Sequence, residues 1–549
     1  MKYIITLILT TLFSATVIYA DIEKTEDQAA FFLRHFKNKN VIKSGTPALL
    51  NLLYGDSDES RSFKAAYAER ERPSMEAFKD SEEGHFRVHY NLSGNNAPDL
   101  TDINLNGVPD YVDSALVYLE YEWQLIVVTL GYGQPKYDGT RGGSIDIIDC
   151  YLQELSTQSL YGYTSPDITS GGPVSSYMII DNDFSEPVYP TKGYDALKIT
   201  TAHEFFHVIH YTYYGGSDAI WWMEHSAVWM ENKAWDDVND YLNYFGFLYL
   251  NRDLPIDTYN GSFEYGASLF AFHIAQKYGE SYIRAIWNSF RDNQNGKIEN
   301  MNTILPEGIA QTISNFAVWT YFTGNRANSR DFFKEANLIT NTMTPDKTTA
   351  EQTTVDSLSF KHYTFKYIDI TPEKGFSYGD SLYFKFEDRN GGMWKNQVIL
   401  YTSPYNYIIE QLPDNQPSIF IPRPFNKAVL VVTNAAQLNK NYKLVYTIDI
   451  QPAKGVEREP QSIPFALLQN FPNPFNNTTT LTYSLNNTSH IILKIMNLSG
   501  QTVATLIDGV RYPGIYNETF DGADLSSGLY FAVLESGRMR LVSKMSLIK

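Results

Sequence analysis

The stretch Thr200–Asn232, TTAHEFFHVIHYTYYGGSDAIWWMEHSAVWMEN, carries the sequence HEFFH at residues 203–207. On a helix, His203 and His207 are four residues apart and lie one above the other, so both imidazoles can reach one metal ion. Glu204 is then turned toward the open coordination position, where a carboxylate can accept a proton from an activated water. The spacing predicts a helical zinc site with Glu204 as the general base.

The third ligand is expected from the second half of this stretch. A loop that contains Gly215 and Gly216 interrupts the first helix, and the next helix carries Glu224. A catalytic zinc site uses three protein ligands and one water, so we expect His203, His207 and Glu224 to bind zinc. The alternative is an amphipathic hairpin whose His and Glu side chains are solvated. His210 lies about 60° around the helix from His207 and is not included in the ligand set.

The motif resembles that of the gluzincin metallopeptidases, in which HExxH is followed by an aromatic-rich helix with the pattern WxxEGxA. Glu224 occupies the Glu position here, and His225 replaces the usual Gly. In the family pattern a second Glu follows seven residues after the first. Here that residue is Glu231, two helical turns from Glu224 on the same face, and it is expected to support a ligand rather than bind the metal. The resemblance also implies a downstream Tyr or His that donates to the oxyanion, and Tyr265 is the candidate. Packing within the helical layer is the alternative role for Tyr265.

The N-terminus indicates export. Met1–Ala20 has one early lysine, a short apolar run and small residues at its end, which is typical of a secretory signal peptide. An N-terminal membrane anchor is the weaker alternative, because the apolar run is short for a membrane span. No other segment has about 18 continuous apolar residues, so we expect the mature chain to be soluble.

Residues 21–80 form a separate N-terminal segment in the sequence pattern. Gln28–Phe36 and Pro47–Tyr54 are expected to be helices with charged breaks between them. The segment is either a propeptide that covers the active-site cleft or the first layer of the catalytic domain, which we place at residues 81–345. The sequence does not distinguish these two possibilities.

Composition excludes some classes of protein. With 43% hydrophobic and 19% charged residues, the 549-residue chain is expected to be globular and to contain several domains. Its net charge of -18 argues against nucleic-acid binding, which requires a basic surface. Cys150 is the only cysteine, so no intrachain disulfide can form. Stability must therefore come from hydrophobic cores and from bound ions.

A second predicted metal site lies in the sequence DINLNGVPDYVD at residues 102–113. Oxygen side chains occupy positions 1, 3, 5, 9 and 12, Gly107 occupies position 6, and position 7 can offer its carbonyl, as in an EF-hand calcium loop. Position 12 is Asp rather than the usual bidentate Glu, and Pro109 stiffens position 8. An Asn/Asp-rich turn without an ion is the alternative. The predicted calcium ligands are Asp102, Asn104, Asn106, Val108, Asp110 and Asp113.

The order of elements around the zinc motif favours an α+β catalytic domain. A helix is expected to begin near Tyr111, followed by short strands at Ser144–Tyr151 and Tyr177–Asp181. The Tyr/Gly/Ser-rich stretch Tyr161–Val174 is expected to be a loop at the rim of a substrate cleft. Helix, strands and then the HExxH helix is the order of a zincin catalytic domain.

From about residue 346 the pattern changes to short alternating strands separated by Gly, Pro and Asn turns. This pattern predicts a β-sandwich at residues 346–450, followed by a polar linker at 451–462. The predicted fold is therefore multidomain: an α+β zincin-like catalytic domain followed by two β-sandwich (Ig-like) domains, the second of which is residues 463–549.

Residues 463–549 resemble a known export signal. The sequences LQNFPNPFN (468–476), LKIMNLSG (493–500), LSSGLYF (525–531) and the terminal KMSLIK are similar to the type A C-terminal sorting domain of the type IX (Por) secretion system. The resemblance implies a seven-stranded Ig-like sandwich that is recognised by an outer-membrane translocon. We therefore expect passage through the periplasm and a final location at the cell surface or in the medium.

Together, the 102–113 loop, the HEFFH helix and the tail look like those of a family of secreted bacterial metalloproteases, over roughly residues 85–340. The first functional hypothesis is a secreted, monomeric zinc metallopeptidase that acts on extracellular proteins and has one structural calcium ion. The second is a non-catalytic surface adhesin or glycan-binding protein that retains a zinc site. Retention of Glu204 favours the enzyme, because a structural site would not need it.

Overall fold

The computed structural model describes most of the chain after residue 41. The predicted signal peptide and the predicted helix Gln28–Phe36 lie outside the described residues, as does almost all of the linker. The described residues are 42–68, 71–143, 146–167, 173–371, 380–403, 406–413, 418–422, 425, 427–451, 465–467, 470, 473–485, 489–511, 514–537 and 539–549.

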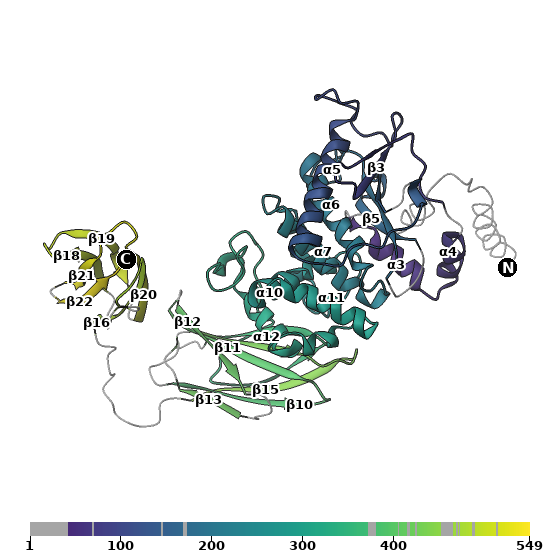
Figure 1. The fold of residues 1–549 in the computed structure, drawn as a ribbon. Coiled ribbons are helices and arrows are strands. Elements are labelled where there is room, and N and C mark those ends of the chain that lie inside the picture. The colour runs from purple at the N-terminus through teal and green to yellow at the C-terminus, as the bar shows by residue number, and fades with distance from the viewer. Residues whose placement is uncertain are drawn as a thin grey trace. The chain divides into compact units, whose positions relative to one another are not determined.

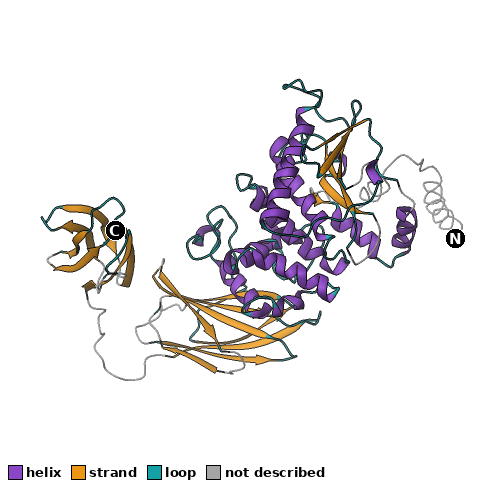
Figure 2. Ribbon diagram, in the orientation of Figure 1, coloured by secondary structure: helices purple, strands orange, loops and turns teal. Residues whose placement is uncertain are grey.

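The chain divides into two compact units. The first comprises Met1–Met343 with Lys361–Thr364 and Ala435–Lys440, and the second comprises Thr344–Phe360, Phe365–Asn434 and Asn441–Lys549. The first unit is an α/β region, and the described residues of the second unit form β-sheets without helices (Figure 2). The chain is thus a multidomain protein. Within the described ranges, no helix is both long enough and apolar enough to cross a membrane.

The α/β region is built on one six-stranded sheet with the strand order β1-β5-β6-β4-β3-β2. Its strands β3 and β5 are labelled in Figure 1, near the helices α5, α6 and α7. Five of its strands take part in parallel pairs, which are β3 with β4, β4 with β6, and β1 with β5, whereas the pairs β5–β6 and β2–β3 are antiparallel. β4 and β6 are buried along almost their whole length because helices cover the sheet. The strands are β1 (Ile42–Ser44), β2 (Ala77–Asp80), β3 (Phe86–Tyr90), β4 (Ile148–Gln153), β5 (Leu160–Pro166) and β6 (Ser176–Asp181).

Two sequence-based expectations differ from this sheet. The segment 21–80 was expected to be helical, but its described part also supplies the strands β1 and β2. The loop expected at Tyr161–Val174 is wrong over its first part, because Leu160–Pro166 is the fully buried strand β5. Tyr161 and Tyr163 are fully buried in this strand, rather than exposed in a loop at the rim of a cleft. β1 and β5 pair with one another across more than a hundred residues of sequence, and local patterns do not encode such pairing, whereas β2 pairs with the nearby β3.

The helices of the α/β region position the zinc motif. α5 begins at Asp110, within the 102–113 loop and one residue before the expected start at Tyr111, and α6 and α7 pack against one another. Asp195 lies in the first turn of α6, where a carboxylate interacts favourably with the helix dipole. The helices are α3 (Thr46–Tyr54), α4 (Asp58–Ala68), α5 (Asp110–Trp123), the π-helix η2 (Gln124–Thr129), α6 (Gly193–His210), α7 (Ile220–Ala234), α8 (Gly246–Leu250), α9 (Phe263–Ala267), α10 (Leu269–Tyr278), α11 (Ser281–Asn293) and α12 (Gly308–Tyr321). The 3₁₀ segments are η3 (Arg141–Gly143), η4 (Ser156–Gln158), η5 (Ser217–Ala219), η6 (Asp240–Asn243), η7 (Ile298–Thr303) and η8 (Gly324–Arg326).

The second unit begins with two sheets. One has the order β13-β10-β15-β8 and the other β12-β11-β14-β9-β7, and every pairing that is described is antiparallel except that of β7 with β9. Their strands are β7 (Lys347–Thr349), β8 (Thr353–Phe360), β9 (Thr364–Ile370), β10 (Ser381–Asp388), β11 (Trp394–Ser403), β12 (Asn406–Leu412), β13 (Ser418–Pro422), β14 (Lys427–Asn434) and β15 (Tyr442–Gln451).

The C-terminal residues form two further sheets with the orders β16-β17-β20 and β19-β18-β21-β22. A single cluster of buried side chains, including Phe475, Leu481, Leu493 and Leu534, fills the interior of this part. It therefore has a hydrophobic core made from its own residues. The strands are β16 (Ala466–Leu467), β17 (Thr478–Leu485), β18 (Ser489–Asn497), β19 (Thr502–Arg511), β20 (Gly514–Asp521), β21 (Gly528–Ser536) and β22 (Met539–Leu547).

Candidate metal centre

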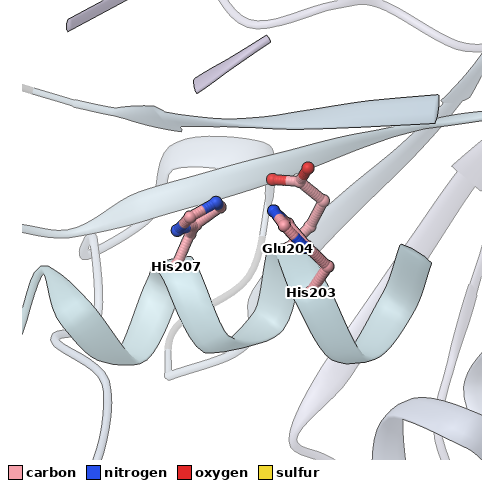
Figure 3. Close-up of side chains that lie close together, drawn as sticks. All are labelled: His203, Glu204 and His207. Atoms are coloured by element: carbon pink, nitrogen blue, oxygen red, sulfur yellow. The ribbon is translucent and has the colours of Figure 1, made fainter. Parts of the chain in front are cut away.

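The HEFFH motif lies in the second half of α6, and its three polar side chains project to one side of the helix (Figure 3). Ligand atoms of His203, Glu204 and His207 all lie within 4.8 Å of one another, and the three side chains are buried. Such a group can hold a metal ion. The i, i+4 spacing produces this geometry without help from the rest of the fold.

α7 brings Glu224 to the same point. Its Oε2 lies 3.3 Å from His203 Nε2 and its Oε1 lies 3.0 Å from His207 Nε2. Within the described part of the chain, none of these four atoms makes a hydrogen bond with acceptable geometry, and neither does Oε1 of Glu204. Buried polar atoms without partners are costly and rare in proteins. Their convergence on one point fits a bound cation, and two imidazoles with a carboxylate are ligands that suit zinc.

The other side of the His203 ring is held by Glu231. His203 Nδ1 donates to Glu231 Oε1 at 2.6 Å, which leaves the lone pair of Nε2 facing Glu224. Oε2 of Glu231 is 2.6 Å from Nζ of Lys43, and Lys43 also pairs with Asp240. Glu231 therefore orients the His203 ring, and its role behind a metal ligand stays a prediction. Lys43 and Asp240 had no signal in the sequence, because they lie far from the motif along the chain.

His207 is held by a chain of hydrogen bonds that sequence reasoning missed. Its Nδ1 is 3.1 Å from Nδ1 of His210, and Nε2 of His210 is 3.2 Å from Oγ of Ser226. The Ser226 hydroxyl donates to the carbonyl of Trp222, so it accepts from His210, and His210 must accept from His207. This assignment leaves a lone pair on His207 Nε2. His210 therefore orients the His207 ring.

Burial keeps these imidazoles neutral. Desolvation lowers the pKa of His203 to about 4 and that of His207 to about 3. A neutral imidazole is the form that binds a metal ion. Burial also raises the pKa of Glu224, and the neighbouring His203 and Tyr265 oppose this rise.

Glu204 lies between α6 and strand β5. Its Oε2 accepts a hydrogen bond from Thr164 Oγ1 at 2.7 Å and another from Thr46 Oγ1 at 3.3 Å. Burial raises the pKa of Glu204 well above its usual value, and the bond from Thr164 opposes the rise. Gly162 permits this close approach, because a Cβ there would lie 3.0 Å from Glu204 Cγ and 2.9 Å from the carbonyl oxygen of Ile179.

Tyr265 lies in α9 and is buried, near the other predicted site residues. Its hydroxyl donates to the carbonyl of Ser44 at 3.1 Å and accepts from the Ser44 amide at 3.2 Å. The predicted oxyanion donor is thus engaged by the backbone of β1. His225, which replaces the usual Gly of the gluzincin pattern, packs edge-on against Trp221 and Trp222.

The predicted calcium loop is a compact turn at the start of α5. Asp102 accepts hydrogen bonds from the amides of Asn106 and Gly107, at 3.2 and 2.8 Å. The side-chain amides of Asn104 and Asn106 both donate to Oδ2 of Asp113, at 3.1 and 2.8 Å. Gly107 has a φ of 86°, which an EF-hand loop requires at its sixth position. The Asp110 carboxylate accepts a hydrogen bond from the amide of Ile103 at 3.1 Å. Asp110 is the first residue of α5, and Val108 and Pro109 immediately precede it.

A second acidic group, Asp181, Asp183 and Glu186, also has the spacing to hold a metal ion. Both carboxylate oxygens of Asp181 already accept hydrogen bonds, from the amides of Leu155 and Phe184 and from the hydroxyl of Tyr189. Asp181 therefore has a structural role at the end of β6, which makes this group the weaker candidate.

Comparison with known proteins identifies the C-terminal part. Residues 469–549 match the secretion system C-terminal sorting domain. The chain is therefore a cargo protein of the type IX secretion system, and its location is extracellular or at the cell surface, as the sequence predicted. No curated protein matches the chain, and no match to a metalloprotease family accompanies the buried His203, Glu204 and His207 group.

Solved structures show only remote similarity. A structure of PorZ, described as a surface component of the type IX secretion system of Porphyromonas gingivalis, is 15% identical, with a TM-score of 0.12. The match covers 19% of this chain and 14% of PorZ. A β-1,2-glucanase from Parabacteroides distasonis is 9% identical over 36% of this chain and 37% of its own, with a TM-score of 0.14. The adhesin domain of Epf from Streptococcus pyogenes is 9% identical over 36% of this chain and 81% of its own, with a TM-score of 0.13. At these TM-scores the similarities carry no functional information.

Proposed function

We propose that this protein is a secreted zinc-dependent metallopeptidase of the gluzincin-like type that hydrolyses peptide bonds in extracellular proteins. The observation that carries the proposal is the convergence of Nε2 of His203, Nε2 of His207 and both oxygens of Glu224, all buried and without hydrogen bonds among the described residues. These residues would hold zinc, while Glu231 and His210 would orient the two imidazoles. Zinc bound there would supply Lewis-acid activation of water and of a carbonyl group.

The chain's own residues supply the remaining functions. Glu204 is next to the proposed ligands but is not one of them. Its Oε1 has no hydrogen-bond partner within the described ranges. That oxygen can accept a proton from the attacking water and later deliver it to the leaving amine. Thr164 fixes the other oxygen. Tyr265 can donate its hydroxyl proton to a developing oxyanion once its bond to Ser44 is exchanged for one to substrate.

The other parts have supporting roles in this proposal. The 102–113 loop would bind one structural calcium ion through the predicted ligands and fix the start of α5. The two sheets of residues 347–451 would form an Ig-like sandwich. Residues 463–549 would be read by the translocon as a second such sandwich. The enzyme is proposed to act as a monomer with a zincin-like catalytic domain.

The test is the Glu204→Gln variant of the chain without Met1–Ala20. Zinc content should stay near one equivalent, because Glu204 is not in the proposed ligand set. Hydrolysis of casein and of a peptide library, followed long enough to detect slow turnover, should fall by about 10²–10⁴-fold. Equal hydrolysis by both proteins would refute the role of Glu204. Stoichiometric zinc without hydrolysis in either protein would instead favour the non-catalytic surface protein.

A further inference from the structure

The candidate metal centre is covered by the chain's own N-terminal residues. We call Ile42–Tyr54, which comprises β1 and α3, the covering segment. His203 and Tyr265 are 1% exposed, whereas Glu204, His207 and Glu224 are 0% exposed. A peptidase must admit a peptide to these groups. Their complete burial in the presence of this segment therefore needs an explanation.

The covering segment contacts both proposed catalytic side chains. The Thr46 hydroxyl donates to Oε2 of Glu204 at 3.3 Å. The Tyr265 hydroxyl donates to the Ser44 carbonyl and accepts from the Ser44 amide. Lys43 also contacts the centre, through its ion pair with Glu231. The other carboxylate oxygen of Glu231 holds His203. Three nearby residues of one short segment thus engage the base, the proposed oxyanion donor and the support of a ligand.

The segment also occupies the edge of the sheet. Among the described strands, β1 lies at the edge of the sheet and pairs with β5, so without β1 the backbone of β5 would be an open edge. Open strand edges bind extended peptides by adding a strand. The amide of Gly45 donates to the carbonyl of Gly162 at 2.9 Å, and Thr46 accepts from the amide of Thr164 at 2.9 Å. The covering segment therefore fills the position at which a peptide could lie beside Glu204.

Three kinds of contact fasten the segment. Lys43 is 2% exposed and pairs with both Glu231 and Asp240. The backbone bonds to β5 hold β1, and α3 buries one apolar face. The buried leucines of that face are Leu49, Leu50, Leu52 and Leu53.

We propose that the covering segment is an intramolecular inhibitor that keeps the metal centre closed, and that the centre opens when the segment leaves β5. Inhibition of peptide hydrolysis rests on the function proposed above, but closure of the centre does not. The segment acts as a competitor that is covalently attached to the enzyme, so its effective concentration at the edge of β5 is high.

The experiment cuts the folded chain between α3 and α4. A recognition sequence for a specific protease is inserted between Asp56 and Ser57, which are both exposed, in the chain lacking Met1–Ala20. The protein is loaded with zinc and measured before and after cleavage. Two rates are followed: loss of zinc to excess EDTA, and hydrolysis of a peptide library. We expect both to rise by about 10–100-fold on cleavage, because the fraction of open molecules rises.

Two further proteins make the result decisive. The same insertion between the exposed residues Ser93 and Gly94 is the matched control. Its cleavage should change neither rate, because the covering segment stays joined to β3, which remains paired with β4. The other protein carries Leu53→Asp together with the insertion between Asp56 and Ser57. This substitution should release the cut segment even if the segment stays bound after cleavage of the chain without it. Mass spectrometry after gel filtration reports whether the segment has left.

Each outcome decides one of the two proposals. Release of the segment with unchanged zinc loss would overturn the inhibition, and so would a segment that remains bound in both cleavable proteins. Faster zinc loss without any hydrolysis would support closure by the segment but refute the peptidase. Equal hydrolysis before and after release would support the peptidase and refute the inhibition.

Discussion

Replacing Glu231 tests how the metal centre is supported. The carboxylate accepts from His203 Nδ1 at 2.6 Å and lies 2.6 Å from Lys43, with both partners buried. In Glu231→Ala, the Nδ1–H of His203 loses its acceptor and no longer holds the ring. A hydrogen bond to a charged group contributes about 1.5–3 kcal/mol. This corresponds to about 10–100-fold in zinc affinity, which is also the usual cost of removing a partner of a metal-binding His.

Two matched variants set the scale for this measurement. Glu231→Gln keeps an amide oxygen for His203 and should lose less affinity than Glu231→Ala. Glu224→Ala removes both oxygens that face the imidazoles, so its loss should exceed that of Glu231→Ala, and zinc should be lost on dialysis. Competition titrations with a zinc-binding dye measure the affinities, and circular dichroism checks that each variant is folded. Wild-type affinity in Glu231→Ala, or weaker binding there than in Glu224→Ala, would refute these roles.

Three further predictions concern the surroundings of the centre and the tail. Gly162→Ala places a methyl group against Ile179 and Glu204 and should lower the free energy of unfolding by about 1–3 kcal/mol, as measured by denaturant titration; unchanged stability would mean that β5 can move away from α6. Asp102→Ala, or chelation of calcium, should lower the melting temperature of the α/β region without removing zinc, and a binding isotherm without calcium uptake at millimolar concentration would reduce the loop to a polar turn. Deletion of Ile463–Lys549 should leave the zinc content unchanged and retain the protein in the periplasm. Cell fractionation measures this location, and truncated chain at the cell surface would contradict the prediction.

The comparison between sequence and structure is clearest at the metal centre. His203, Glu204 and His207 were found from the sequence because helical geometry alone places them together. Glu231 was expected near the centre from its two-turn spacing to Glu224, which is also a local property, and it hydrogen-bonds to His203. The hydrogen bond between His210 and His207 was not expected from the sequence. That bond depends on Ser226 of the neighbouring helix, which fixes the His210 tautomer.

The sequence by itself determined the parts of this protein that depend on short-range patterns. These are the HEFFH helix, the turn before α5, the change from an α/β region to β-sheets, and the sorting domain at the C-terminus. Each is encoded by residues close together in the chain, so periodicity and spacing are sufficient to reveal it.

Only the tertiary structure decided how the centre is held and closed. Lys43 reaches Glu231 across 188 positions of sequence, and β1 finds its place beside β5 more than a hundred residues away. The strand β5 was expected to be a loop, because its Tyr/Gly/Ser-rich sequence does not reveal that Tyr161 and Tyr163 are fully buried in the folded chain. Contacts of this kind depend on which surfaces meet in the folded chain. A local pattern does not specify that meeting, so the covering of the metal centre became visible only in three dimensions.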